Sequence, residues 1–213
     1  MERIKTFSKD LKYAFHVCTH PLDGFWDLKH EKRGRIYIAI FLLVMYVITN
    51  ILDKQFNGYT FNEFAVFPED INVIRTFIIT ALVVLIWVMA NWGVTTLFDG
   101  EGSMRDILIY TGYSMLPIVL SQIVLLLFTN ILTTNEATIV SLITYVGIGW
   151  TAILLYMGTM TTHQYSGGKT FITAIVIALG MAVIIFLGMM FFYLIQEMWN
   201  FVYTIYRELE LRR

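Results

Sequence analysis

The sequence has few of the residues that build and separate soluble domains. Charged residues form 15% of its 213 positions, whereas soluble domains carry about 25%. It has 3 prolines and no proline-rich or glycine- and serine-rich run, so no flexible linker divides the chain. Its single cysteine, Cys18, excludes an internal disulfide and suits a reducing compartment or a buried thiol. These shortages predict one compact domain.

Motifs of common enzyme and nucleotide-binding classes are missing as well. The run Gly167-Gly168-Lys169-Thr170 ends like a phosphate-binding loop, but His163 stands where that loop needs its earlier glycine. No acidic or basic residue lies at the centre of an apolar stretch. This argues against an ion-coupled transporter and weakens the case for an intramembrane hydrolase. We expect no cofactor and no nucleic-acid partner.

What the chain has in abundance is apolar length, with 57% hydrophobic residues and a mean hydropathy of +0.67. Several stretches approach or exceed the ~20 residues that cross a bilayer. They are Ile36–Leu52, Val73–Leu97, Ile107–Ile131, Ala137–Met160 and Phe171–Ile195. The sequence therefore predicts an all-α, polytopic membrane protein with five transmembrane helices. Residues 1–35 form a cytoplasmic amphipathic segment, residues 36–206 the membrane domain and residues 207–213 a short tail.

The distribution of basic residues predicts the orientation. Lysine and arginine are concentrated before the first stretch, whereas the loop after it holds Lys54 and Arg75 among several acidic residues. The positive-inside rule therefore places the N-terminus on the cytoplasmic side of the cell membrane. Five spans then put the C-terminus outside, although Arg207, Arg212 and Arg213 lie in that tail. The basic residues before the first stretch are Arg3, Lys5, Lys9, Lys12, Lys29, Lys32, Arg33 and Arg35.

The N-terminal segment has the pattern of two amphipathic helices. Apolar residues recur at three-to-four-residue spacing from Ile4 to Cys18, and Pro21 begins a second short helix. The basic run Lys29–Arg35 follows and should attract the head groups of anionic lipids. We expect this segment to lie on the cytoplasmic leaflet as an interfacial anchor and topology signal. The alternative is that it docks onto a partner protein.

Polar residues inside the spans suggest how the helices pack. The amides of Asn91 and Gln122 need hydrogen-bond partners in lipid, so we expect both to bond across helices. Pro117 removes one helical hydrogen bond and clashes with the carbonyl of Tyr113, which predicts a kink in the third span. A neighbour such as Ser114 is expected to satisfy the freed carbonyl.

Polar segments at the expected cytoplasmic helix ends are the candidates for chemistry. They are the turn Asp99-Gly100-Glu101-Gly102, the tip His163–Ser166 and the segment His20–Asp23. Carboxylates and imidazoles of this kind hold Zn, Mn or Mg. Alternatively, Asp99 and Glu101 cap helix N-termini around a turn whose glycines supply special backbone angles. The candidate functional cluster comprises Asp99, Glu101, His163, Tyr165, His20 and Asp23.

The same motifs resemble those of the Yip (Ypt-interacting protein) domain family. The resemblance covers nearly the whole chain and is most specific over residues 91–117. It rests on a set of motif residues along the chain: His20, Pro21, Gly24, Phe25, Asn91, Trp92, Asp99, Gly100, Glu101, Gly102, Tyr113, Ser114, Pro117, Tyr165 and Ser166. Eukaryotic members sit in Golgi and endoplasmic-reticulum membranes, bind small Rab-type GTPases and serve vesicle traffic. The chain lacks that branch's Asp-Leu-Tyr-Gly-Pro motif and long cytoplasmic region, and it looks more like the bacterial branch.

These observations together predict a non-enzymatic membrane scaffold or accessory subunit of a membrane assembly related to transport or trafficking. Its expected partners are the bilayer, anionic lipids at the basic segment and a membrane protein such as a transporter subunit. The GTPase-binding role does not carry over to this chain. A small transporter or channel is the first alternative, and a metal-dependent membrane enzyme with a cytoplasmic-face site is the second.

Overall fold

The computed structural model describes residues 2–56, 72–128 and 137–211, and all regular secondary structure in these ranges is helical. The helices of the N-terminal segment are α1 (Glu2–Thr19) and α2 (Pro21–His30). The remaining helices are α3 (Ile36–Phe56), α4 (Val73–Leu97), α5 (Met104–Ser114), α6 (Leu116–Phe128), α7 (Ala137–His163) and α8 (Gly167–Leu211). Within the described ranges, five helical stretches are long and apolar enough to cross a membrane, so the predicted fold class is confirmed.

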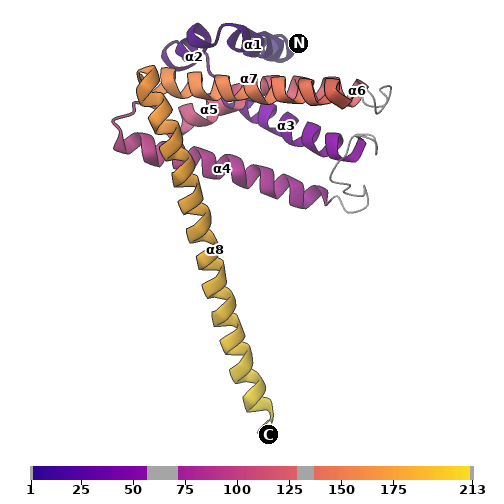
Figure 1. Ribbon diagram of the computed structural model, residues 1–213, viewed down its shortest axis with the longest axis vertical. Coiled ribbons are helices and arrows are strands. Elements are labelled where there is room, and N and C mark those ends of the chain that lie inside the picture. The colour runs from indigo at the N-terminus through magenta and orange to yellow at the C-terminus, as the bar shows by residue number, and fades with distance from the viewer. Residues whose placement is uncertain (1, 57–71, 129–136, 212–213) are drawn as a thin grey trace.

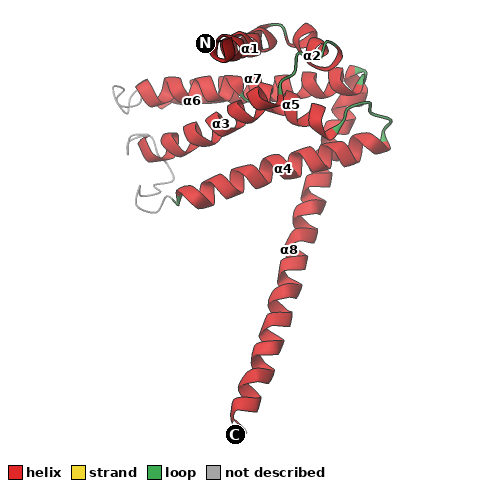
Figure 2. Cartoon of the chain, turned by 180° about the vertical axis from the view of Figure 1, so that it is seen from behind, coloured by secondary structure: helices red, strands yellow, loops and turns green. Residues whose placement is uncertain are grey.

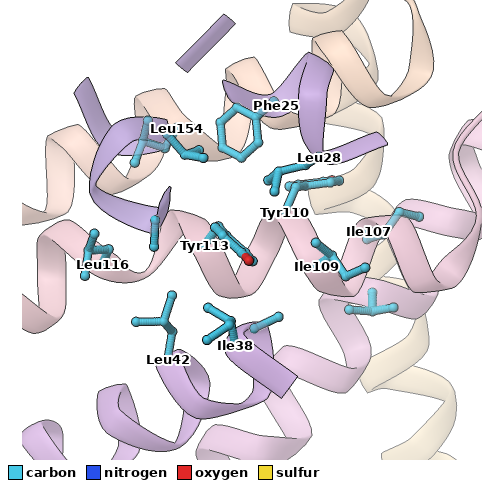
Figure 3. Packing of buried hydrophobic residues seen from close by; sticks show 14 residues of the cluster. Phe25, Leu28, Ile38, Leu42, Ile107, Ile109, Tyr110, Tyr113, Leu116 and Leu154 are labelled. Atoms are coloured by element: carbon cyan, nitrogen blue, oxygen red, sulfur yellow. The ribbon is translucent and has the colours of Figure 1, made fainter. Parts of the chain in front are cut away.

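Helix α5 lies at the centre of the bundle, because α1, α2, α3, α4 and α7 all pack on it. Figure 3 shows Phe25 and Leu28 of α2 on one side of α5, and Ile38 and Leu42 of α3 on the opposite side. The span formed by α5 and α6 has 56% of its apolar window buried, against 17% for the spans of α4 and α7. The outer spans expose most of their apolar surface, as lipid-facing helices do.

The third span is interrupted at the position that its proline predicts. Helix α5 ends at Ser114 and α6 begins at Leu116, and the Met115 N–H donates back to the Gly112 carbonyl at 3.2 Å. Pro117 has no N–H for the carbonyl of Tyr113, so a regular helix cannot continue through this point. The expected role of Ser114 was wrong, since its hydroxyl donates to the Tyr110 carbonyl at 2.8 Å instead.

The amphipathic N-terminal helices pack on the chain's own bundle. Ala14 and Val17 of α1 are 0% exposed and Phe25 of α2 is 1% exposed, and all three belong to the central core. The indole N–H of Trp150 on α7 donates to the Cys18 carbonyl at 3.1 Å. Figure 2 shows both helices lying along one side of the bundle. Much of the apolar face that we expected to enter the lipid leaflet is therefore covered by protein.

Helix α8 is far longer than the stretch 171–195 predicts. It has 45 residues, which at about 1.5 Å per residue gives roughly 67 Å, whereas the hydrocarbon core is about 30 Å thick. Its first part packs on α4, where Ile177 is buried against Ala90 and Val94. Figure 1 shows the rest of α8 leaving the bundle at a steep angle to α4 and α7. Phe192 and Trp199 on this outer part are 72% and 73% exposed.

The close approach of α3 and α5 yields a test of the fold. A Cβ at Gly112 would lie 2.6 Å from the Ala39 Cα, so Gly112→Ala must push two helix backbones apart. We expect a loss of about 1–3 kcal/mol, the usual cost of overpacking, seen as a lower thermal midpoint in detergent. Gly93→Ala is the matched control, because apart from its chain neighbours and its own helix backbone no described atom lies within 4 Å of its added Cβ. Equal midpoints for the two variants would contradict this packing.

Candidate functional site

The ends of α4 and α7 meet at one end of the bundle, beside the loops that lead into α5 and α8 (Figure 2). We call this region the polar cap. It consists of the α4–α5 turn (residues 98–103), the α7–α8 turn with the end of α7 (residues 162–166), and the side chains of Lys29 and Lys169. Because helix ends leave backbone carbonyls without intrahelical partners, such a junction needs donors from elsewhere in the chain.

His163 is the buried centre of the polar cap, with 1% of its surface exposed. Its Nδ1 accepts a hydrogen bond from the Gly102 N–H at 3.2 Å. With Nδ1 acting as an acceptor, the neutral ring carries its proton on Nε2. Among the described residues, Nε2 has no hydrogen-bond partner. The imidazole therefore joins the end of α7 to the turn before α5.

Tyr165 joins the next turn to the end of α4. Its hydroxyl lies 3.1 Å from the carbonyl oxygens of both Thr95 and Phe98, to which it can donate. Burial raises the pKa of this hydroxyl, and the nearby Asp99 carboxylate acts in the same direction. The phenol thus stays neutral and remains a donor. Lys169 of α8 lies 4.3 Å above its ring and donates from Nζ to the Phe98 carbonyl at 2.7 Å.

Lys29 connects α2 to the same junction. Its Nζ donates to the Thr162 carbonyl at 2.7 Å and lies 3.3 Å from a carboxylate oxygen of Glu101. The Lys29 side chain is 16% exposed and that of Glu101 is 64% exposed, so solvent screens the ion pair and it adds little to stability. The bond to Thr162 matters more, because a cation at a helix C-terminus also complements the helix dipole.

The glycines of the α4–α5 turn are required for space and not for backbone angle. We predicted special backbone angles, but neither Gly100 nor Gly102 has a positive φ, and that conformation falls on Asp99, with φ 56. A Cβ at Gly100 would lie 2.6 Å from the Tyr165 hydroxyl, and one at Gly102 would lie 2.5 Å from the His163 ring. The turn can approach the two rings because both positions lack a side chain.

The predicted capping by Asp99 and Glu101 was wrong. Ser103 caps α5, and Ser103 and Asp106 form a reciprocal capping box, in which the Ser103 N–H donates to Asp106 at 3.0 Å. The sequence carried this signal, since a serine followed three residues later by an acid before an apolar run is typical of a helix start. The exposed Asp99 shapes the turn through its left-handed backbone.

His20 and Asp23 lie apart from the polar cap. The His20 ring stacks on His16 with centroids 5.0 Å apart, and its Nδ1 lies 2.9 Å from the Thr19 hydroxyl. Asp23 is exposed in the first turn of α2. Within the described ranges, no group of three or more His, Cys, Asp or Glu side chains could hold a metal ion. The contact from the N-terminal segment comes instead from Lys29, which the sequence did not single out.

A second set of polar bonds lies inside the bundle and joins helices side by side. The Asn91 amide donates to the Tyr110 hydroxyl at 2.7 Å, and this hydroxyl lies 3.0 Å from that of Thr159. Trp92, beside Asn91 in the chain, is 42% exposed. Between α3 and α6, the Thr49 hydroxyl donates to Gln122 at 2.6 Å. The buried amides therefore bond across helices, as their position in the spans predicts.

Two further motif residues lie on either side of the junction between α5 and α6. Tyr113 is 1% exposed, and its hydroxyl accepts from the Arg35 N–H at 3.5 Å. Pro117 is buried at the start of α6. Chemically, the polar cap and these residues supply hydrogen bonds mainly to backbone groups and to one another. The arrangement can hold helix ends in fixed positions.

Comparison with known proteins identifies a family. The family described as the Yip1 domain matches residues 15–198 of this chain. No curated protein and no solved structure matches it. The matched range includes the polar cap, the Asn91–Tyr110–Thr159 set and most of α8.

Substitutions in the α4–α5 turn test whether space or charge matters there. We expect Gly100→Ala to cost about 1–3 kcal/mol, because its Cβ would also lie 2.9 Å from the Thr95 carbonyl oxygen. Asp99→Asn should leave the thermal midpoint unchanged, since Asn tolerates a left-handed backbone, whereas Asp99→Val should lower it.

Gly168→Ala controls for the loss of a glycine near a helix end, because apart from its chain neighbours and its own helix backbone no described atom lies within 4 Å of its added Cβ. A stable, correctly inserted Asp99→Asn protein that has lost its cellular function would show that the carboxylate itself is needed. That result would contradict a purely structural turn.

Proposed function

The chain belongs to the Yip1 domain family, and from this premise we propose that it is a non-enzymatic scaffold or accessory subunit of a membrane assembly. We place it in a bacterial plasma membrane, with the N-terminus in the cytoplasm and the C-terminus outside. The assembly that it serves is related to transport or trafficking, and its partner is another membrane protein, such as a transporter subunit.

The use of the polar side chains supports a non-enzymatic role. Proteins of this family are generally non-enzymatic and act in trafficking. In the polar cap, His163, Tyr165 and Lys29 bond to backbone groups of other elements. Inside the bundle, Asn91 and Tyr110 bond to one another. These side chains are occupied in holding helices together, which is what a scaffold requires.

Support for the bacterial branch comes from a missing motif. The sequence lacks the Asp-Leu-Tyr-Gly-Pro motif of the branch that binds Rab-type GTPases. A chain without that motif needs a different partner, and a membrane protein is the class that its exposed apolar helices suit. We therefore do not propose GTPase binding for this chain.

Helix α8 is the observation that carries the proposal. After its contact with α4, it continues to Leu211 beyond the rest of the bundle (Figure 1). Its outer part is rich in exposed aromatic residues, which favour contacts with membrane proteins and with the membrane interface. They are Phe186, Phe191, Phe192, Tyr193, Trp199, Phe201, Tyr203 and Tyr206. A helix that projects in this way offers a partner a long surface without disturbing the polar cap.

The proposed orientation can be tested with reporter fusions. The concentration of lysine and arginine before α3 predicts that a reporter fused before Met1 reports the cytoplasm. A reporter inserted at Asn57 should report the outside. A cytoplasmic signal from Asn57 would contradict the orientation and would place the polar cap on the outer face.

Photo-crosslinking in cell membranes tests the proposed role of α8. A photoreactive phenylalanine analogue at Phe191 or Tyr193, which are 61% and 60% exposed, should give a discrete adduct with a different membrane protein. The same analogue at Phe77 on α4, which is 50% exposed, is the matched control and should give no such adduct.

The crosslinking outcomes separate the possible neighbours of α8. A discrete adduct whose mass and peptides identify another membrane protein supports the accessory role. Adducts with a second copy of the chain indicate self-association, and adducts with lipid alone indicate a helix that faces only the bilayer. Either of the last two results would contradict the proposal.

A further inference from the structure

A polar cavity of about 570 Å³ lies between α1 and the turn that leads from α2 into α3. It is distinct from the polar cap, since none of its lining residues belongs to that region. The lining side chains come from both elements: Thr6, Lys9, Asp10, Tyr13, Arg33 and Arg35. Three of these residues are cationic and one is acidic, so the lining carries a net positive charge.

Two of the cations in this cavity stand outside the ion pairs that the described residues form. Lys9 and Arg35 are exposed, and neither forms an ion pair with a described residue. Among the described lining residues the carboxylate is that of Asp10, and one of its oxygens accepts a hydrogen bond from the Tyr37 hydroxyl. An anion entering the cavity would therefore meet the cations Lys9 and Arg35 together with the single negative charge of Asp10, so the positive charge is in excess.

The third cation, Arg33, is held in place as part of the cavity wall. Its Nε lies 2.7 Å from a Glu31 carboxylate oxygen, and its Nη1 lies 3.5 Å from Asp27. The guanidinium also lies 5.6 Å from the centre of the Tyr13 ring, whose hydroxyl donates to Asp27 at 2.9 Å. These contacts compensate the charge of Arg33 and fix its side chain beside the cavity.

The backbone that carries the two arginines lies close against α5. Lys32 has a positive φ of 54, and the Gly34 N–H donates to the Leu28 carbonyl at 3.2 Å. A Cβ at Gly34 would lie 2.9 Å from both that carbonyl oxygen and the Ile109 side chain. The turn is therefore seated closely on the bundle, and it presents Arg33 and Arg35 from a rigid base.

The position of the cavity along the first span indicates the depth at which it lies. Arg35 immediately precedes the apolar stretch Ile36–Asp53, which is long enough to cross the bilayer. The residue that flanks such a stretch lies at the level of the lipid head groups, where phosphates are concentrated. The N-terminus of α3 adds partial positive charge beside Arg35.

We propose that Lys9 and Arg35 bind the phosphate group of an anionic ligand in this cavity. Arginine suits the task because its planar guanidinium pairs with two phosphate oxygens, while lysine adds a point charge. A lipid head group and a soluble phosphate share this chemistry, and the experiment below distinguishes them. The site does not depend on the scaffold role proposed above.

Binding is measured on the full chain in detergent by the shift of its thermal midpoint with ligand concentration. Dioctanoyl phosphatidic acid should raise the midpoint, whereas dioctanoylglycerol, which lacks the phosphate, should not. Lys9→Gln and Arg35→Gln should each weaken the apparent affinity about tenfold, because each removes a charged hydrogen bond to phosphate. Lys12→Gln is the matched control, since Lys12 is exposed on the same helix outside the cavity lining.

The response to the two phosphate compounds shows whether the bound phosphate belongs to a lipid or to a soluble ligand. A shift with phosphatidic acid but not with inorganic phosphate assigns the site to a lipid head group, and equal shifts assign it to a soluble phosphate ligand. Should Arg35→Gln fail to fold, Lys9→Gln decides alone, because Lys9 lies on an exposed helix face. Wild-type affinity in Lys9→Gln, or no shift with either phosphate compound, would overturn the site.

Discussion

The rest of this structure depends on the hydrogen bonds that seat the α7–α8 turn on the end of α4. Each helix end leaves carbonyls without intrahelical partners, and burying them unpaired would cost free energy. Here the Tyr165 hydroxyl reaches two carbonyls of the α4 end, and Lys29 reaches the Thr162 carbonyl of α7. The ends of α4 and α7, α2 and the first turn of α8 are thereby held in one arrangement.

The Asn91–Tyr110–Thr159 set repeats this connection one helical turn deeper. Asn91 precedes Thr95 by four residues, and Thr159 precedes His163 by four, so both lie on the helix faces that meet in the polar cap. Tyr110 of α5 bonds to both of them. The set therefore fixes α5 between α4 and α7 below the point where the cap holds their ends. Because α5 is the centre of the core, the positions of α2 and α3 follow from it.

Membrane spans were predictable from sequence because hydrocarbon demands an uninterrupted apolar length, and the predicted bounds of α4 match the structure. The length of α8 was not predictable from sequence. Its outer part mixes aromatic with charged residues, so it lacks the uninterrupted apolar pattern of a membrane span. The pattern of α1 and α2 correctly predicted amphipathic helices. It could not tell whether lipid or protein covers their apolar faces, and Val17 and Phe25 turn out to be buried in the core.

The candidate site, too, was predictable in part: its location followed from the sequence, but the partners of its side chains did not. Proximity of the α4–α5 turn to His163 followed from helix order, since an even number of crossings returns the chain to the same membrane face. The partners within the cap depend on details that spacing does not encode. Gly100 is needed for its closeness to Tyr165, and Lys29 reaches the cap from a helix more than a hundred residues away in the sequence from Thr162. To predict such contacts, one must know how the helices pack.

Hydrogen exchange at the backbone of the α4–α5 turn tests the central role of the polar cap most directly. The Gly100 N–H is bonded to Thr95 at 2.8 Å and the Gly102 N–H to His163 at 3.2 Å. His163→Phe keeps an aromatic ring but removes the acceptor. If the cap holds the helix ends together, exchange in this variant becomes faster over residues 98–106 and over residues 163–169. Unchanged protection of the α4–α5 turn would show that the bundle holds it without the cap.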